Sequence, residues 1–253
     1  MQSHSVVSRS EWMEARKALL AEEKAWTRER DRLAEKRRAL PWVLVDKDYT
    51  FDGAGGPVTL SDLFDGRSQL VVYHFMFGPA WQEGCPSCSL VADHVDGARQ
   101  HFEHVDVSFA AVSRGPIEKL EVYRRRMGWN FTWVSSANND FNFDYHVSFP
   151  ERSRADGVFY NFQEQPDPEV DELPGVSVFY RDESGAIYHT YSAYARGVEM
   201  FLGVYAYLDI VPRGRNEPRE GTMDDWVRRH DSYENDGRTS STASQTAADK
   251  SAT

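Results

Sequence analysis

The sequence has few cysteines, no long apolar run and no excess of positive charge, and each shortage excludes a class of protein. Two cysteines cannot build a disulfide framework for 253 residues. No apolar run approaches the roughly 20 residues of a membrane-spanning helix, and the N-terminus lacks the apolar segment of a secretory signal. A net charge of −11 opposes binding to nucleic-acid phosphates. We therefore expect a cytoplasmic protein that binds neither membranes nor nucleic acids.

Both cysteines lie in one segment, Leu70–Ala92, which is predicted to form a strand, a turn and the start of a helix. Leu70–Phe77 has the continuous apolar character of a strand buried on both faces. Gly78–Gly84 contains the breakers of a turn. The helix is expected to begin at Cys85 with Pro86 in its first turn, where the missing N–H costs nothing. Because a helix N-terminus favours thiolate over thiol, this placement indicates a reactive or metal-binding pair rather than a structural one.

The rest of the chain predicts three regions. Residues 1–40 form an N-terminal helical extension, in which Ser10 is the expected N-cap. Its large apolar residues recur every seven positions, and so narrow a stripe predicts either a surface brace or a homodimer contact. Residues 41–212 form one α/β domain, whose strand and helix alternation predicts a largely parallel central sheet. Residues 213–253 form a polar tail that we expect to be disordered after about residue 235.

Residues 136–173 are unusual for a connection between elements of a compact domain. The segment is long, which is typical of a functional lid, and its many aromatic side chains argue against disorder. We predict that this aromatic insertion is either a lid or additional core. A hairpin over Val176–Tyr191 and a closing helix over Gly197–Ile210 follow it.

The order of strand, Cys-x-x-Cys helix, strand, helix, hairpin and closing helix resembles the thioredoxin-like fold over about residues 42–212, with an approach segment like that of the peroxiredoxin branch. Four phrases of the sequence carry a narrower resemblance: YHFMFGPAWQEGCPSCS, AVSRGPIEKLEVYRRRMGW, WVSSANNDFNFDY and PGVSVFYRD…YHTYSAYARG. In them the chain resembles the family called domain of unknown function 899, a set of predicted dithiol-disulfide oxidoreductases. This resemblance implies a central mixed sheet flanked by helices and a thiol pair that cycles with a disulfide.

The resemblance implies a role for each cysteine. Cys85, at the helix start, would be the attacking thiolate with a lowered pKa, and Cys88 would resolve the mixed disulfide. Their spacing places both sulfurs on one face of the helix. Thioredoxin keeps a buried acid near its second thiol, and Tyr73 and His74 occupy the corresponding strand here. Either could relay a proton, although a core histidine bonded to backbone is the simpler interpretation of His74.

Five further residues are candidates for contact with substrate. Pro86 follows the attacking cysteine, and Trp81 is predicted either to shield the thiol or to anchor the turn. Arg114, at the end of a strand, would stabilise a thiolate or cap the sheet. Pro174 has the order of the cis-proline that faces the thiols in thioredoxin-like folds, and Leu173 would then present backbone groups to the substrate.

Two alternative functions stay open at this point. The Cys-Pro step resembles that of peroxiredoxins, but the positions that should carry their Thr/Ser and Pro hold Gln82 and Gly78, which argues against a peroxidase. The other alternative is a binding module, in which the aromatic insertion recognises a peptide or small molecule and the thiols are incidental.

We predict no metal and no organic cofactor. Cys85 and Cys88 with His74 or His94 would leave a zinc site short of its four ligands, and the chain has no phosphate loop or dinucleotide-binding fingerprint. The expected partners are a disulfide-containing protein or a small-molecule disulfide, together with a separate reductant.

Overall fold

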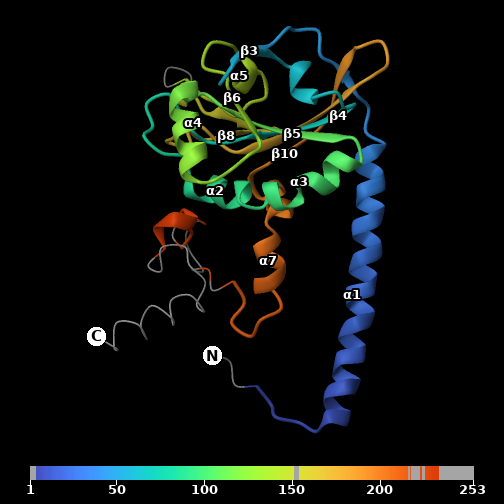
Figure 1. Cartoon of the computed structure of the whole chain (residues 1–253). Helices are drawn as coiled ribbons and strands as arrows, with labels where there is room; N and C mark the ends of the chain where they lie inside the picture. Colours follow the sequence, from blue (N-terminus) through green and yellow to red (C-terminus); the bar gives the residue numbers. More distant parts are fainter. Residues whose placement is uncertain (1–3, 151–153, 216, 218–222, 224–225, 234–253) are drawn as a thin grey trace, which may run out of the picture. The chain divides into compact units, whose positions relative to one another are not determined.

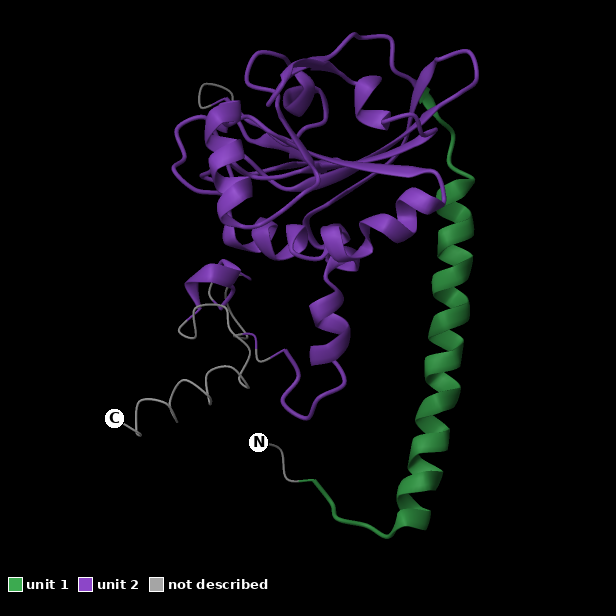
Figure 2. Cartoon of the chain, viewed as in Figure 1, with its two compact units in different colours: residues 1–43 green, residues 44–253 purple. Residues whose placement is uncertain are grey.

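The computed structural model describes residues 4–150, 154–215, 217, 223 and 226–233 (Figure 1). The chain divides into two compact units, residues 1–43 and residues 44–253 (Figure 2). The predicted disorder after about residue 235 lies outside the described residues.

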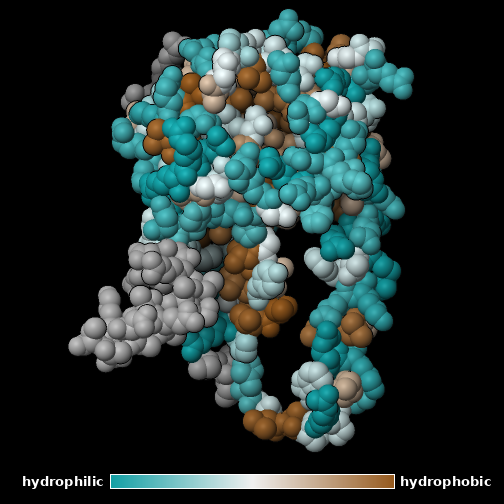
Figure 3. Space-filling view, viewed as in Figure 1, coloured by the Kyte–Doolittle hydropathy of each residue, from teal (hydrophilic) through white to brown (hydrophobic). Residues whose placement is uncertain are grey.

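Unit 1 is dominated by one helix, α1 (Arg9–Arg38). The expected N-cap Ser10 is wrong: the helix begins after Ser8, whose hydroxyl accepts from the Glu11 N–H while Glu11 accepts from the Ser8 N–H. This reciprocal pair is a capping box, and it requires an acid or amide three residues after the cap. No residue of α1, all of which is described, is buried, and brown apolar side chains mark its surface in Figure 3.

Unit 2 is built on a mixed sheet with the strand order β10-β9-β4-β5-β6-β2-β3. The three middle strands β4, β5 and β6 are parallel, and the strands on both sides of them run antiparallel. The strands are β2 (Thr50–Gly53), β3 (Gly56–Thr59), β4 (Gln69–His74), β5 (Val107–Ser113), β6 (Thr132–Ser135), β9 (Gly175–Arg181) and β10 (Ile187–Tyr194); β1 (Val43–Leu44) stands at the boundary of the two units.

Short helices cover both faces of this sheet (Figure 1). One face packs against α2 (Pro86–Ala92), α3 (Val95–His104), α4 (Ile117–Arg126), the 3-10 helix η2 (Ala195–Phe201) and α7 (Gly203–Leu208). The other face packs against η1 (Asp62–Phe64) and α5 (Phe141–Asp144). Both cysteines belong to the first core, and so does Tyr73 of β4. Because side chains alternate along a strand, the neighbours of Tyr73 on β4 point to the other face.

The predicted alternation of strand and helix around the cysteines is confirmed, and together with the β9–β10 hairpin it gives the thioredoxin-like fold. One predicted element is divided: the cysteine helix becomes α2 and α3, with a break at His94. The His94 ring donates through Nδ1 to the Leu90 carbonyl at 2.7 Å. A side chain that takes this carbonyl competes with the backbone bond that would continue the helix. The closing helix is likewise divided, into η2 and α7.

Where it is described, the aromatic insertion supplies core with several of its aromatic side chains, whereas Phe162 is 67% exposed. Phe141 and Tyr145 pack into the second core, against β4 and β9. A smaller cluster contains Val147, Phe149 and Tyr160, around the hairpin of β7 (Val158–Tyr160) and β8 (Gln163–Gln165).

The polar segment after residue 213 is not wholly detached. Val227 is fully buried, and the short helix η4 (His230–Ser232) follows it. Arg126 of α4 pairs with Asp231 at 2.6 Å, which ties η4 to the domain.

Candidate functional site

The two cysteines sit where β4 and its following loop meet the start of α2. Cys85 is the N-cap of α2 and Pro86 occupies the first turn, so the predicted helix start is confirmed. The Cys85 N–H donates to the Met76 carbonyl at 3.1 Å, which fixes the loop against the end of β4. The two cysteines are not joined by a disulfide. Both are buried: Cys85 is 6% exposed and Cys88 is 1% exposed.

Hydrogen bonds connect the two sulfurs to Tyr73. The Cys88 thiol donates to the Cys85 sulfur, and Cys88 in turn accepts from the Tyr73 hydroxyl and from the Met76 backbone. Burial and the bond to Cys85 raise the pKa of Cys88 well above its ordinary value. Burial raises the pKa of Tyr73 as well. At neutral pH both groups therefore carry their protons, so that Tyr73 is a donor toward Cys88 and Cys88 is a donor toward Cys85.

A hydroxyl also lies beside the first thiol. Ser87 Oγ is 3.1 Å from Cys85 Sγ. When Cys85 is ionised, the Ser87 hydroxyl and the Cys88 thiol can both donate to it. Together with the positive end of α2, they favour the thiolate.

His74, the other predicted relay residue, is not brought to the thiols. It follows Tyr73 on the strand and so points to the opposite face, where its ring packs against Phe141 and Tyr145. Its Nε2 lies 2.9 Å from Ser177 Oγ. Complete burial lowers the pKa of His74 to about 3, so the ring is neutral. His74 is therefore a core histidine with an internal hydrogen-bond partner, which was the simpler interpretation. The partner is the Ser177 hydroxyl and not a backbone group.

A chain of donors that the sequence did not indicate holds the loop of Cys85. Arg229 Nε donates to the Tyr123 hydroxyl at 3.0 Å. Tyr123 lies 2.9 Å from Ser89 Oγ, which donates to the Cys85 carbonyl at 2.8 Å. The Arg229 guanidinium also donates through Nη2 to the Gly84 carbonyl at 2.7 Å. Arg229 belongs to the segment that was predicted to be a polar tail. Its guanidinium instead lies against the carbonyl of Gly84, the residue before Cys85.

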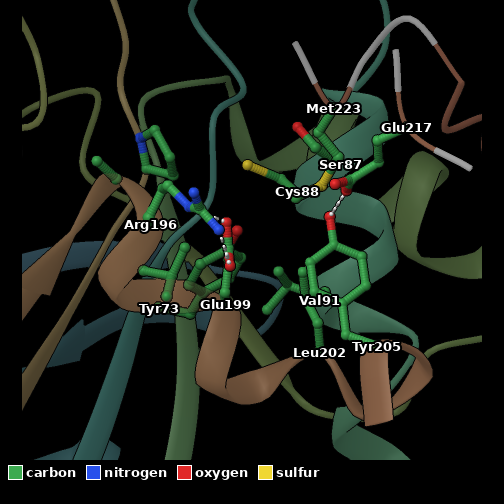
Figure 4. A pocket seen from close by; sticks show the side chains of 13 residues that line it. Tyr73, Ser87, Cys88, Val91, Arg196, Glu199, Leu202, Tyr205, Glu217 and Met223 are labelled. Carbon is green, nitrogen blue, oxygen red and sulfur yellow. Dashed lines mark hydrogen bonds and ion pairs between the residues drawn. The ribbon is translucent and has the colours of Figure 1, made fainter. Parts of the chain in front are cut away.

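A cavity of about 350 Å³ opens beside Cys88 (Figure 4). Ser87, Cys88 and Pro174 form part of its wall, so the structure brings one predicted contact residue, Pro174, to the thiols. Across the cavity, the Tyr205 hydroxyl donates to Glu217 at 2.7 Å. Other lining residues are Tyr73, Val91, Ala195, Arg196, Val198, Glu199, Leu202 and Met223.

The predicted geometry at Pro174 is wrong in one respect. None of the described peptide bonds is cis, so the bond from Leu173 to Pro174 is trans, the form that X–Pro bonds prefer by about 0.5–1 kcal/mol. The Leu173 N–H donates to the Val147 carbonyl at 2.9 Å. The Pro174 carbonyl accepts from the Tyr160 hydroxyl at 2.7 Å. The Leu173 N–H and the Pro174 carbonyl are therefore both bonded within the chain, to residues of the aromatic insertion.

Trp81 and Arg114 come together on a different cavity, of about 530 Å³, whose described wall includes neither cysteine. The Trp81 indole donates to Asp171 at 3.2 Å. Arg114 pairs with Glu172 at 3.4 Å and lies 4.4 Å from the centre of the Phe143 ring. Trp81 thus anchors the turn, although it also packs against the core that contains Cys85.

Glu172 is a buried acid that the sequence did not single out. It is 1% exposed and accepts from the Ser148 hydroxyl at 2.6 Å. Burial raises its pKa to about 7, against the opposing effects of Ser148 and Arg114. It titrates near neutral pH, at the position just before Leu173 and Pro174.

The described part of the chain offers neither a metal site nor a membrane-spanning helix. The described residues contain no group of three or more His, Cys, Asp or Glu side chains that could hold a metal ion. Within that part, no helix combines the length and apolar character needed to cross a membrane.

A family model described as "Bacterial protein of unknown function (DUF899)" matches residues 1–233. The chain belongs to the DUF899 family. The DUF899 match includes both cysteines and continues through Arg229, so the segment that holds the Cys85 loop lies within the family region. A comparison with curated proteins finds no match.

Several solved structures are similar to this DUF899 chain at low sequence identity, and they bear the names of redox proteins. The peroxidoxin BcpB of Mycobacterium tuberculosis is 16% identical, with 64% of this chain and 90% of that chain covered and a TM-score of 0.46. Peroxiredoxin Q of Xanthomonas campestris is 13% identical, covering 63% and 88%, with a TM-score of 0.43. A putative thiol:disulfide interchange protein DsbE of Chlorobium tepidum is 15% identical, covering 60% and 86%, with a TM-score of 0.37.

Proposed function

We propose that this DUF899 protein is a thiol-disulfide oxidoreductase with Cys85 as nucleophile and Cys88 as resolving thiol. The observation that carries the proposal is the position of the dithiol: Cys85 is the N-cap of α2 with Ser87 Oγ 3.1 Å from its sulfur, and the buried Cys88 follows within the first turn. The helix N-terminus favours a negative charge on Cys85, and burial keeps the proton on Cys88.

In the first step, the Cys85 thiolate attacks one sulfur of a substrate disulfide. A bond forms between that sulfur and Cys85, and the other substrate sulfur leaves as a thiolate. Ser87 and Pro174, on the wall of the cavity beside Cys88, are placed to contact the substrate, and Pro86 adjoins the attacking residue. Because the Cys85 thiolate is the nucleophile, this step depends on the positive end of α2 and on the nearby donors.

In the second step, Cys88 loses its proton and attacks the Cys85 sulfur. The bond between Cys85 and the substrate breaks, and the second substrate thiol leaves with a proton. The sum is the transfer of two electrons and two protons from the dithiol to the substrate. A separate dithiol reductant must then reduce the Cys85–Cys88 disulfide, as a reducing cytoplasm would supply.

The experiment is reduction of insulin or of a model disulfide by the native protein, Cys85→Ser and Cys88→Ser, with hydrogen peroxide consumption measured alongside. The native protein should turn over, Cys85→Ser should fall to background, and Cys88→Ser should stop after one equivalent. Full turnover by Cys85→Ser would overturn the proposal. Peroxide consumption that survives in Cys88→Ser, with disulfide reduction lost, would establish a thiol peroxidase instead. If neither substrate reacts and the dithiol shows no reversible loss of two protons, the chain is a binding module.

A further inference from the structure

We propose that the substrate of this dithiol carries an aliphatic chain, which binds in an apolar cavity beside the thiols. The inference rests on the proposed function and adds the chemical class of the substrate. The cavity has a volume of about 510 Å³ and lies between the sheet and the layer formed by α2, α3, η2 and α7. This volume is within the range of small-molecule sites.

The wall of this cavity offers no charged group. Its residues are Val71, Tyr73, Val91, His94, Val95, Ala98, Phe102, Val107, Phe109, Val176, Met200, Phe201 and Gly203. A polar ligand that left water for such a wall would lose hydrogen bonds without replacement. An aliphatic chain loses none and gains from burial.

The two polar side chains on the wall are already bonded. His94 donates from Nδ1 to the Leu90 carbonyl at 2.7 Å, and its Nε2 accepts from the Val204 N–H at 3.0 Å. The Tyr73 hydroxyl donates to Cys88. The described wall therefore selects for hydrocarbon along its length.

This cavity adjoins the one at the thiols. Tyr73 and Val91 line both cavities. The Cys85 sulfur lies 3.1 Å from Ser87 Oγ, and Ser87 lines the cavity at the thiols. An alkyl chain on a sulfur bonded to Cys85 can therefore extend along that cavity and past Tyr73 into the apolar cavity. Apolar residues are also exposed where the wall reaches η2, with Met200 at 52% and Phe201 at 38%. Exposed apolar side chains beside a cavity are typical of an apolar binding site.

The test uses mixed disulfides of thionitrobenzoate with alkyl thiols, from methyl to octyl. The Cys85 thiolate attacks the alkyl sulfur, the alkyl group joins Cys85 through a new S–S bond, and thionitrobenzoate leaves as a coloured thiolate. Cys88 then loses its proton, attacks Cys85 and releases the alkyl thiol. The second-order rate constant for colour release should rise up to about fourfold per methylene until the cavity is filled. The same series with glutathione as the nucleophile corrects for intrinsic reactivity.

Ala98 provides matched variants, because it is an exposed residue of α3 on the wall of the cavity. Ala98→Phe should abolish the dependence on chain length by filling the space, and Ala98→Ser should retain it. A calorimetric titration of the native protein with octanol gives a second readout that needs no chemistry. Octanol should bind the native protein and Ala98→Ser, with a negative heat-capacity change, and should not bind Ala98→Phe.

The outcomes separate the two proposals. No colour release from any member of the series would overturn the oxidoreductase, and octanol binding would still report on the cavity. Release at one rate for all chain lengths would overturn the inference and leave the oxidoreductase intact. Octanol binding that is unchanged in Ala98→Phe would also overturn it, because the bound molecule would then lie elsewhere.

Discussion

At the scale of single residues, the resolving thiol is the group whose chemistry the site constrains most. Cys88 must ionise in the second step, yet burial holds its pKa well above the ordinary value, and Tyr73 is one of the few groups that oppose this shift. Tyr73 cannot act as a base at neutral pH, because its own pKa is raised. It stabilises the Cys88 thiolate as a donor, and the rate of the second step should therefore increase with pH.

Tyr73→Phe should slow this second step. Loss of the hydroxyl removes a hydrogen bond to a charged sulfur, worth about 1.5–3 kcal/mol, so release of the second product thiol at pH 7 should fall by roughly 10- to 100-fold. Stopped-flow measurement of the two product thiols separates the steps. Tyr207→Phe, at a residue 73% exposed, is the control. If both steps slow equally, or neither does, Tyr73 does not act on Cys88.

Glu172 predicts a pH dependence of stability. Its pKa is about 7 in the folded protein against a usual 4.5. A carboxyl whose pKa is raised on folding stabilises the fold when protonated, so this contribution is lost as pH rises from about 4.5 to about 7. The loss is up to roughly 3 kcal/mol, from about 1.4 kcal/mol per pKa unit. Urea unfolding of the native protein and of Glu172→Gln between pH 5 and 8 measures it.

The glutamine of Glu172→Gln cannot ionise, so the variant does not lose this contribution. As pH rises, the unfolding free energy of the native protein should therefore fall relative to that of the variant. Comparison of the two proteins removes the contributions of other titrating groups that they share. A difference that stays constant over this pH window would contradict a raised pKa for Glu172.

At the scale of elements, the Cys85 loop depends on a segment far along the chain. Arg229 binds the Gly84 carbonyl and the Tyr123 hydroxyl, and pairs with Glu83 at 3.0 Å. Arg229→Gln should lower the alkylation rate of Cys85 at pH 7, by roughly tenfold at most, because it removes a positive charge that favours the thiolate. Mass-resolved alkylation with iodoacetamide measures the rate. The neighbouring Arg228→Gln is the matched control, and an equal effect in both variants would show only a change in net charge.

The elements nearest the cysteines could be predicted because their signals are local. Leu70–Tyr73 of β4 belong to one apolar run, and Pro86 with the preceding breakers fixes the start of α2. Other features depend on partners that no window of sequence contains. The break at His94 needs a tertiary bond to Val204 as well as the local bond to Leu90.

The site itself could be predicted only in part for the same reason. Alternation along β4 predicts that Tyr73 and His74 point to opposite faces. Which face carries the cysteines is decided by how α2 packs, so both residues stayed candidates. Arg229 lies in a polar stretch without periodicity, and its partner Gly84 is distant in sequence. Only the folded chain identifies it.

At the scale of the whole molecule, α1 carries the apolar repeat from which a homodimer is predicted. Trp12, Leu19, Trp26 and Leu33 recur every seven residues and are between 43% and 64% exposed. A seven-residue repeat is the pattern that lets two helices pack along a shared seam. We therefore keep the prediction of a homodimer through this helix.

Leu19→Glu combined with Trp26→Glu should convert the dimer to a monomer, because two charges would enter the apolar seam. Sedimentation equilibrium of the full chain gives the mass. Lys24→Glu, on the same helix but outside the repeat, is the control and should remain dimeric. A native protein that is monomeric, or a dimer that survives the double substitution, would contradict the prediction.

The most direct test of the dithiol mechanism is the intact mass of the reduced protein after reaction with glutathione disulfide. Cys88→Ser should hold one glutathione, on Cys85, because no resolving thiol remains. The native protein should hold none and should lose two protons as Cys85 and Cys88 join. An adduct on Cys88 in Cys85→Ser, with Cys88→Ser unmodified, would reverse the roles of the two cysteines and contradict the account.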